Sequence, residues 1–178
     1  MEKNRQGLLH IYCGDGKGKT SAAVGLAVRA AGCGMKVLVV RFLKTENSGE
    51  VEVLRSIPGI TVPPCDRTFG FVFRMTDEQK QEAALYYQRR FEAAAEEAVQ
   101  GEYDLLVLDE ILASCNYGMV RETSVVEFLK NRPEKLEVVL TGRNPSETFL
   151  ELADYVSEIR MRRHPYEKGI PARRGIEF

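Results

Sequence analysis

Short apolar runs alternate along the chain with longer stretches in which apolar and polar residues are mixed. The runs are rich in β-branched residues, as expected of strands that are buried on both faces. They predict strands at residues 8–13, 36–42, 60–62, 103–110, 136–143 and 155–162. The mixed stretches predict helices at residues 19–31, 50–56, 76–100, 124–132 and 145–153, of which the third and fourth open with capping residues at Thr76 and Ser124.

Strands that alternate with helices in this way indicate a three-layer α/β fold, with an open, mostly parallel sheet and helices on both faces. The sequence contains no internal repeat, low-complexity tract or linker, so we expect a single domain over residues 1–178. Residues 43–49 are expected to form a loop. Residues 65–75 are the least regular stretch and contain three phenylalanines.

A glycine-rich segment directly follows the first predicted strand and reads Gly14-Asp15-Gly16-Lys17-Gly18-Lys19-Thr20-Ser21. Its glycines allow sharp turns, and the helix predicted from residue 19 aims the positive end of its dipole at the same point. Lys19 and Thr20 match the last two positions of a phosphate loop, which contact the β/γ-phosphates and Mg²⁺. We therefore predict that this segment binds a nucleoside triphosphate.

The match to the phosphate-loop pattern is shifted by one place, because Cys13 stands where the strict pattern has its first glycine. The alternative is an ordinary glycine-rich turn followed by an accidental Lys-Thr pair. The order of strand, glycines, Lys-Thr and helix favours the phosphate loop. The fold class that follows is a P-loop NTPase (RecA-like) architecture.

Two further strands end on residues that suit a triphosphate site. In an open parallel sheet, ligands bind beyond the carboxyl ends of the strands, where Asp109, Glu110 and Arg143 are expected. One acid is expected to bind Mg²⁺ with Thr20 while its neighbour anchors the loop, and Arg143 is expected to contact phosphate oxygens. The alternatives are solvated acids and an ordinary surface arginine, and Lys17 is either phosphate-binding or solvated.

Composition narrows the class of protein. With 44% hydrophobic and 29% charged residues and a net charge of −1, the chain gives no general reason to expect a nucleic-acid partner. No apolar run approaches the ~20 residues of a membrane span, and residues 1–6 lack the apolar stretch of a secretory signal. The four scattered cysteines indicate reduced, mostly buried thiols, so a cytoplasmic protein is expected.

No nucleophile–base arrangement stands out in the sequence. Of the two histidines, His10 and His164, the first lies within a predicted strand and is expected to be structural. This inventory fits a reaction that requires charge neutralisation and positioning without a protein nucleophile.

Several segments besides the glycine-rich one carry a family resemblance, at residues 41–44 with 49–50, 107–110, 139–143, 152–158 and 164–177. Together they resemble the ATP:corrinoid adenosyltransferases of the CobA/CobO/BtuR type, over residues 8–178. The shifted first glycine is itself a feature of that family. The resemblance implies transfer of the 5′-deoxyadenosyl group of ATP to the cobalt(I) of a reduced corrinoid, either cobalamin or cobyrinic acid a,c-diamide, in adenosylcobalamin biosynthesis or salvage.

In the reaction that the resemblance implies, cobalt(I) attacks the 5′ carbon of ATP and inorganic triphosphate leaves whole. ATP then lies in the loop in the reverse of the usual direction. The implied catalytic residues are Lys19, Arg143, Phe71 and Phe73. The implied ATP-binding residues are Gly14, Asp15, Gly16, Lys17, Gly18, Lys19, Thr20, Ser21 and Arg143. The implied Mg²⁺ ligands are Thr20 and Glu110, and Asp109 is the neighbouring candidate.

The aromatic stretch matches a Phe-Thr-Trp segment of the family, which packs near the corrin and displaces the lower ligand of cobalt so that reduction is easier. Here the matching residues are Phe71-Val72-Phe73, so Phe73 replaces the tryptophan. An apolar wedge is retained, with a smaller ring and no indole N–H. Plain core packing of these phenylalanines is the alternative.

The resemblance also implies a homodimer and an electron-donating flavoprotein or reduced flavin as partner. Family members often carry a longer leader over the corrinoid site, whereas about seven residues precede the first strand here, so a more open site is expected. Two other functions are retained as alternatives. One is a different P-loop kinase, and the other is a non-catalytic relative that binds corrinoid or ATP.

Overall fold

A six-stranded sheet forms the centre of the structure, a computed structural model that describes residues 6–70 and 72–177. Its strand pairings are parallel, in the order β3-β2-β4-β5-β1-β6. The strands are β1 (Leu9–Cys13), β2 (Val37–Arg41), β3 (Ile60–Thr61), β4 (Leu105–Asp109), β5 (Glu137–Thr141) and β6 (Tyr155–Glu158). The predicted parallel sheet is confirmed, and β5 lies between β1 and β4.

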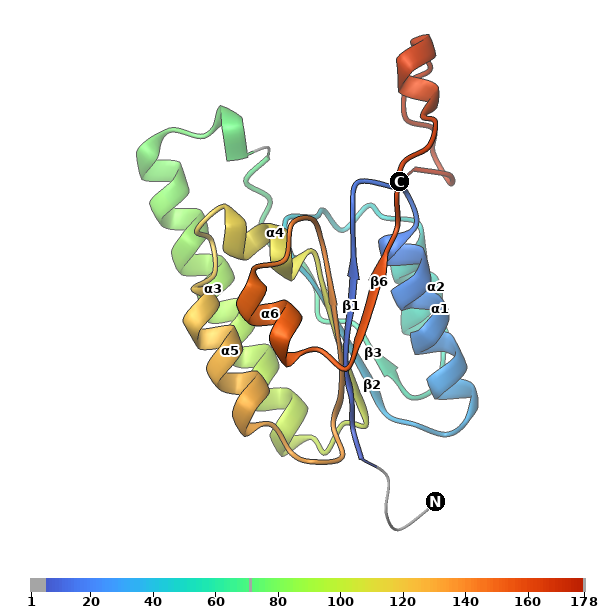
Figure 1. The fold of residues 1–178 in the computed structure, drawn as a ribbon, viewed down its shortest axis with the longest axis vertical. Coiled ribbons are helices and arrows are strands. Elements are labelled where there is room, and N and C mark those ends of the chain that lie inside the picture. The colour runs from blue at the N-terminus through green and yellow to red at the C-terminus, as the bar shows by residue number, and fades with distance from the viewer. Residues whose placement is uncertain (1–5, 71, 178) are drawn as a thin grey trace.

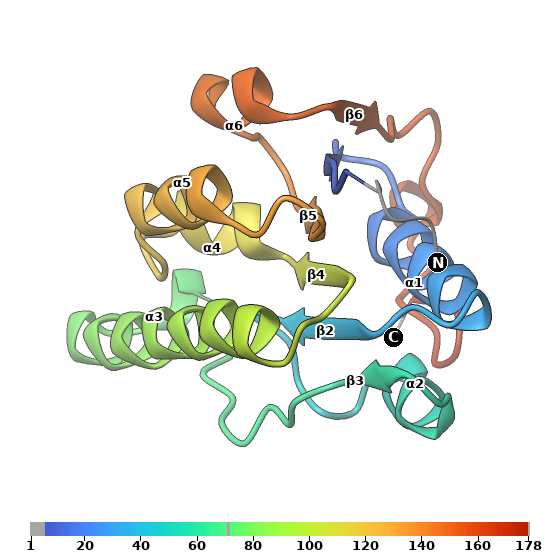
Figure 2. The ribbon, with the colours of Figure 1, turned by 90° about the horizontal axis from the view of Figure 1, so that it is seen from below.

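Helices cover both faces of this sheet and give the three predicted layers. Figure 2 shows α1 and α2 on one side of the strands and α3, α4, α5 and α6 on the other. The helices are α1 (Lys19–Gly32), α2 (Glu50–Ser56), α3 (Asp77–Gln100), α4 (Ile111–Asn116), α5 (Glu122–Asn131) and α6 (Glu147–Leu152). Two short 3₁₀ turns are η1 (Val72–Arg74) and η2 (Pro165–Lys168).

Alternate side chains of the strands enter two hydrophobic clusters, because successive side chains of a strand point to opposite faces. On β2, Leu38 and Val40 belong to the cluster under α3 and α5, whereas Val37 and Val39 belong to the cluster under α1. All five residues of β2 and all five of β4 are buried. The continuous apolar runs in the sequence follow from this double covering.

Helix α3 begins at the predicted capping box. The Thr76 hydroxyl accepts the N–H of Gln79 at 3.3 Å, and the Gln79 side chain accepts the N–H of Thr76 at 2.9 Å. The predicted start of α5 at Ser124 is wrong by two residues. This helix begins at Glu122, because the extended Arg121 before it is already held by a bond from its N–H to a side chain of α3.

The last strand and helix α4 also differ from the prediction. Strand β6 ends at Glu158, because its partner β1 turns away after Cys13. The N–H of Ile159 still donates to the Cys13 carbonyl at 2.8 Å, and the tail that follows projects from the sheet (Figure 1). Helix α4 directly follows Glu110 and has six residues, too few for a helical period to appear in the sequence.

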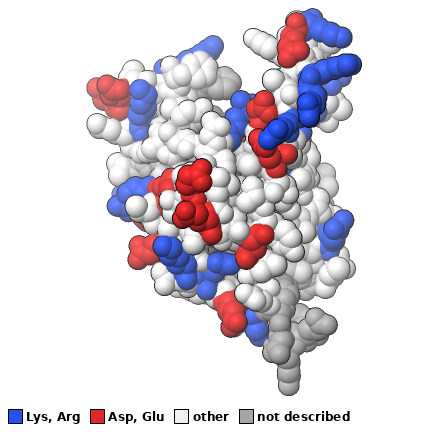
Figure 3. All heavy atoms as spheres, viewed as in Figure 1, with Lys and Arg blue, Asp and Glu red and all other residues white. Residues whose placement is uncertain are grey.

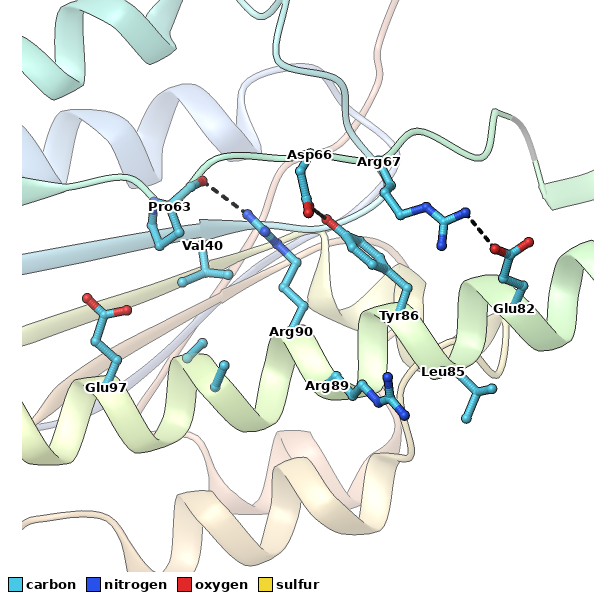
Figure 4. Close-up of a pocket in the computed structure, with 12 residues that line it drawn as sticks. Val40, Pro63, Asp66, Arg67, Glu82, Leu85, Tyr86, Arg89, Arg90 and Glu97 are labelled. Atoms are coloured by element: carbon cyan, nitrogen blue, oxygen red, sulfur yellow. Dashed lines mark hydrogen bonds and ion pairs between the residues drawn. The ribbon is translucent and has the colours of Figure 1, made fainter.

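A hollow of about 410 Å³ lies between α3 and the segment after β3 (Figure 4). Arg90 fastens this segment by donating to the carbonyls of Pro63 and Pro64 at 3.2 and 2.7 Å. The Tyr86 hydroxyl donates to Asp66 at 2.6 Å, and burial together with this bond raises the pKa of Tyr86 to about 12. Of the predicted site residues that the structure describes, none lines this hollow.

The surface charges, the helices and the cysteines can be compared with the expectations drawn from composition. Figure 3 shows side chains of both charges spread over the body and Lys and Arg side chains along the C-terminal tail. In residues 6–70 and 72–177, no helix is both long enough and apolar enough to cross a membrane. All four thiols are free: Cys13 and Cys65 are buried, Cys115 is partly buried and Cys33 is exposed.

Candidate phosphate and metal site

The glycine loop, residues 14–20, connects β1 to α1. Gly14 has a φ of +106°, and a Cβ on it would lie 2.3 Å from the carbonyl oxygen of Ile159. The N–H of Gly16 donates to that same oxygen at 2.8 Å. Gly18 reaches a φ of +119° immediately before the helix. Glycine is needed here both for the left-handed backbone and for the close approach of the tail.

Lys19 lies at the start of α1 and is buried, with 8% of its surface exposed. Its ammonium donates to the carbonyl of Gly16 at 2.8 Å. Burial lowers the pKa of Lys19, and the charge of Arg143 adds to this effect while Glu110 and Asp15 oppose it. The loop therefore encloses a desolvated positive charge, which an anionic ligand would stabilise.

Asp109, the last residue of β4, is bonded to side chains of α1 and β5. Its Oδ1 accepts the hydroxyls of Thr20 at 2.9 Å and Thr141 at 2.7 Å. The Thr141 hydroxyl in turn accepts the N–H of Glu110 at 2.9 Å. Strand β5 lies next to β4 in the sheet, so the hydroxyl of Thr141, at the end of β5, is close enough to bond both Asp109 and the N–H of Glu110. Asp109 is thus an anchoring residue, fully buried and held by hydroxyl groups.

Glu110 differs from Asp109 in its backbone conformation and in the surroundings of its carboxylate. It has a left-handed backbone with φ of +63° and caps the start of α4. Burial and the charge of Asp109 raise the pKa of Glu110, although Lys44, Lys19 and Arg143 pull in the other direction. Among the described residues, its carboxylate has no hydrogen-bond partner and lines an open cleft. It is therefore the acid that is available to a cation or ligand.

The cleft has a volume of about 620 Å³ and lies beside Lys44, Glu110 and Arg143. The Asn116 side chain fixes the turn that carries Arg143, since it donates to the carbonyls of Arg143 and Asn144 at 2.9 and 3.1 Å. Arg143 is an exposed residue. A cleft of this size suits a small-molecule ligand, and its charged rim suits an anion that carries a cation with it.

The other predicted loop residues lie toward the tail or the solvent. The carboxylate of Asp15 accepts the N–H of Met161 at 2.9 Å, and this bond lowers the pKa of Asp15. The ammonium of Lys17 lies 3.3 Å from Glu177 Oε1, also in the tail. Ser21 is exposed on the first turn of α1. The structure thus groups Lys19, Thr20, Asp109, Glu110 and Arg143, and turns Asp15 and Lys17 to the tail.

Of the predicted aromatic pair, Phe71 lies outside the described residues. Phe73 belongs to η1 and is 78% exposed, with the Arg74 guanidinium 5.6 Å from the centre of its ring. Phe69 instead packs on Tyr86 and Tyr87, with ring centres 5.5 and 5.8 Å apart. Core packing therefore accounts for Phe69 but not for Phe73.

Two residues of the site were not predicted from the sequence as site residues. Thr141 bridges Asp109 to β5, and its signal is its place at a strand end, just before Arg143. Lys44 donates to the Thr20 hydroxyl at 2.8 Å and forms an ion pair with Asp109. The feature of the sequence that could have identified Lys44 is its position in the loop after a buried strand.

Solved structures of similar fold define the broad class of the protein. The chain superposes on EssC (ATPases 2 and 3) from Geobacillus thermodenitrificans with a TM-score of 0.51 and 14% identity, covering 96% of this chain and 36% of that one. The cytoplasmic domain of EssC gives a TM-score of 0.52 and 15% identity, covering 94% and 34%. This chain thus spans about a third of each, and the likeness concerns the fold alone. Fold and glycine loop together define a P-loop α/β protein.

Sequence relatives define the family. Residues 5–178 match the family described as ATP:corrinoid adenosyltransferase BtuR/CobO/CobP. The corrinoid adenosyltransferases of Pseudomonas aeruginosa and Escherichia coli K12 are each 33% identical over 177 residues, covering 99% of this chain and 86% and 88% of theirs. Corrinoid adenosyltransferase CobA of Salmonella typhimurium is 32% identical, covering 99% and 88%. The chain belongs to the ATP:corrinoid adenosyltransferase family.

Proposed function

We propose that this enzyme transfers the 5′-deoxyadenosyl group of ATP to the cobalt(I) of a reduced corrinoid and releases triphosphate. The observation that carries the proposal is the buried, positively charged Lys19 inside the glycine loop. Next to it in the sequence is Thr20, and the carboxylate of Glu110, which has no hydrogen-bond partner among the described residues, lines the cleft. Membership of the adenosyltransferase family supports the choice of ATP and corrinoid as substrates.

The proposed step balances without a protein nucleophile. An electron pair on cobalt(I) forms the bond to C5′ of ATP, and the electrons of the C5′–O bond leave with the triphosphate. Among the described residues that line the cleft, none is a cysteine, histidine or serine. The tasks left to the protein are to align C5′ with cobalt and to neutralise the leaving triphosphate, and we propose Lys19, Arg143 and N–H groups of the glycine loop for the second task.

Magnesium is part of the proposal, and the side chains present suit it. Mg²⁺ prefers oxygen ligands, and we propose the hydroxyl of Thr20, which is bonded to Asp109, and the carboxylate of Glu110, which lines the cleft. In the described part of the chain, no three His, Cys, Asp or Glu side chains gather to hold a metal ion, so phosphate oxygens and water must complete its shell. When bound, the ion would add positive charge against the triphosphate.

The corrinoid side of the proposal rests on the aromatic segment. The exposed ring of Phe73 on η1, with Phe71 two residues before it in the sequence, is proposed to pack on the corrin and displace the lower cobalt ligand. We further propose a homodimer, a flavoprotein or reduced flavin as electron donor, and a single domain over residues 1–178. A cytoplasmic location is supported by the four free thiols.

Analysis of the products tests this function against its alternatives. The protein is mixed anaerobically with ATP, Mg²⁺ and reduced corrinoid, and the phosphates are separated. We expect inorganic triphosphate in amounts equal to the adenosylated corrinoid. Release of ADP would indicate a kinase, and ATP binding without turnover would indicate a non-catalytic relative.

A further inference from the structure

Lys44 occupies the place at which a divalent cation is proposed to bind. Its ammonium lies against the Thr20 hydroxyl, at 2.8 Å, and against the second oxygen of Asp109. We propose, in an inference that rests on the proposed function, that Lys44 is a resident cation. It neutralises this site in the nucleotide-free protein and turns to the triphosphate when the nucleotide brings its metal ion.

Competition follows from the hydrogen-bonding capacity of the Thr20 hydroxyl. This group donates its one proton to Asp109 and accepts the ammonium of Lys44 on its oxygen. A divalent ion would bind through that same oxygen, and two cations a few ångströms apart repel each other strongly in a partly buried site. The Asp109 side chain is 2% exposed, so water screens this repulsion poorly. Ammonium and metal ion are therefore alternative occupants.

The cleft offers Lys44 a second position. Lys44 itself lines the cleft, together with Glu110 and Arg143. A lysine side chain carries a compact charge at the end of a flexible four-carbon stem, so its ammonium can change partners while the backbone stays in place. A triphosphate in the cleft would attract this ammonium away from Asp109. The same residue would then add a positive charge to the leaving group.

The backbone around Lys44 is held from both sides. Leu43 has a left-handed φ of +53°, which is uncommon outside glycine and marks a constrained turn. Arg41, with 1% of its surface exposed, donates to the carbonyl of Thr45 at 2.9 Å and to the carboxylate of Glu46 at 3.0 Å. A fixed loop that carries a flexible side chain is what a change of partner by Lys44 requires.

Binding of Mn²⁺ in the absence of nucleotide, followed by electron paramagnetic resonance, tests this inference. We expect Lys44→Met to bind Mn²⁺ at least about tenfold more tightly than the unmodified protein, because the competing cation is gone. Lys44→Arg keeps a cation at the site and is expected to bind Mn²⁺ as weakly as the unmodified protein. Lys80→Met removes the same charge from an exposed site on α3, where Lys80 pairs with Asp77, and is expected to change nothing.

A second readout separates this role from a purely structural ion pair. Affinity for inorganic triphosphate with Mg²⁺ is expected to fall about tenfold in Lys44→Met, whereas a static pair with Asp109 would leave it unchanged. Thermal melting of each variant shows that it is folded, and Lys44→Gln, which retains a hydrogen-bond donor, replaces Lys44→Met if that variant is unfolded. Equal Mn²⁺ affinity in the unmodified protein and in folded Lys44→Met, or in folded Lys44→Gln where that variant replaces it, would overturn the inference. Neither readout uses corrinoid or turnover, so this failure leaves the proposed function untouched.

Discussion

The ammonium of Lys19 is held in a buried position that disfavours its charge, with the Gly16 carbonyl as a partner. A ligand that supplies negative charge removes this penalty, which is the physical reason for a lysine inside the loop. We expect Lys19→Ala to lower ATP affinity and turnover about 100-fold or more. Its melting temperature should stay within about 2 °C of the unmodified protein, because a desolvated charge is lost along with one hydrogen bond. Calorimetric titration with ATP measures the first effect, and unchanged affinity would contradict the assignment.

Burial also disfavours the charged form of Glu110, and in a carboxyl group this raises the pKa instead of lowering it. Burial and Asp109 raise the pKa of Glu110 above its usual 4.5, so at neutral pH its charge opposes folding. Glu110→Gln is therefore expected to raise the melting temperature by about 2 °C at pH 7 while Mg²⁺-dependent turnover is lost. The gain in stability should disappear at pH values below 4.5, where both side chains are neutral.

Glu127→Gln on the exposed face of α5 serves as the control for Glu110→Gln, because it removes the same charge from an exposed position outside the site. It is expected to alter neither melting nor turnover. A loss of stability in Glu110→Gln would show that the carboxylate is a structural partner and not a free ligand.

Single residues of this site differ in how far the sequence predicts them. Lys19 and Thr20 are predictable because their spacing from the glycines is local. Asp109 is predictable because it ends an apolar strand. Lys44 and Thr141 reach Asp109 from other strand ends. Their contacts depend on which strands are neighbours, and a hydrophobic pattern along one chain carries no such information.

At the level of elements, the loop between β2 and α2 is held by a chain of ion pairs. The Glu46 carboxylate contacts the guanidinium of Arg41 at 3.0 Å and that of Arg55, on α2, also at 3.0 Å. Burial tends to raise the pKa of Glu46, but the N–H of Cys65 and the two guanidiniums outweigh it, so the pKa is lowered. Glu46 thus ties the loop that carries Lys44 to both flanking elements.

Because the pKa of Glu46 is lowered in the folded protein, the direction in which the stability changes with pH can be predicted. The stabilisation from the Glu46 charge is present above the unfolded pKa of about 4.5 and is lost as the pH falls through the lowered folded pKa. Glu46→Gln should therefore melt about 3 °C below the unmodified protein at pH 7, with the difference closing in acid below pH 4.5. Glu52→Gln, on the exposed face of α2, is the matched control and is expected to have little effect. A difference that does not change with pH would refute the electrostatic account.

The short turn η1 presents Phe73 to solvent, and the role proposed for its ring is on the corrinoid side of the site. We expect Phe73→Ala to slow turnover several-fold when a cobalt(II) corrinoid must be reduced on the enzyme, and Phe73→Trp to speed it. Neither variant should melt more than about 1 °C from the unmodified protein, since the ring is largely exposed. With corrinoid reduced beforehand to cobalt(I), the rates should be equal. An equal loss in both assays would remove the wedge role from Phe73.

The sequence predicts some elements better than others, for physical reasons. It predicts the central strands, because they are covered on both faces and must be apolar throughout, and it predicts helix α3 from its capping box. It does not predict helix α4, because six residues are too few to show a helical period. The sequence predicts the end of β6 too late, because residues 159–161 run on beside the glycine loop, with hydrogen bonds to Cys13, Gly16 and Asp15, after the pairing with β1 has ended.

On the scale of the whole molecule, the parallel sheet brings the chemistry together. Every strand points its carboxyl end to one edge, so the glycine loop after β1, Asp109 at the end of β4 and Thr141 at the end of β5 meet there. The alternation of strands and helices predicts this convergence, but not that β5 separates β1 from β4. That order explains why Thr141 is the bridge. The fold supplies a charged cleft, and in the proposed reaction the nucleophile is the cobalt(I) of the substrate.

The central claim is that the cleft supports attack by cobalt(I) on ATP. The direct measurement is the absorbance of a cobalt(I) corrinoid, followed anaerobically after addition of protein, ATP and Mg²⁺. We predict that the cobalt(I) signal decays only when protein and ATP are both present, with one triphosphate released for each cobalt(I) consumed, and that Lys19→Ala suppresses the decay. Persistence of the cobalt(I) signal with folded, ATP-binding protein would contradict the account.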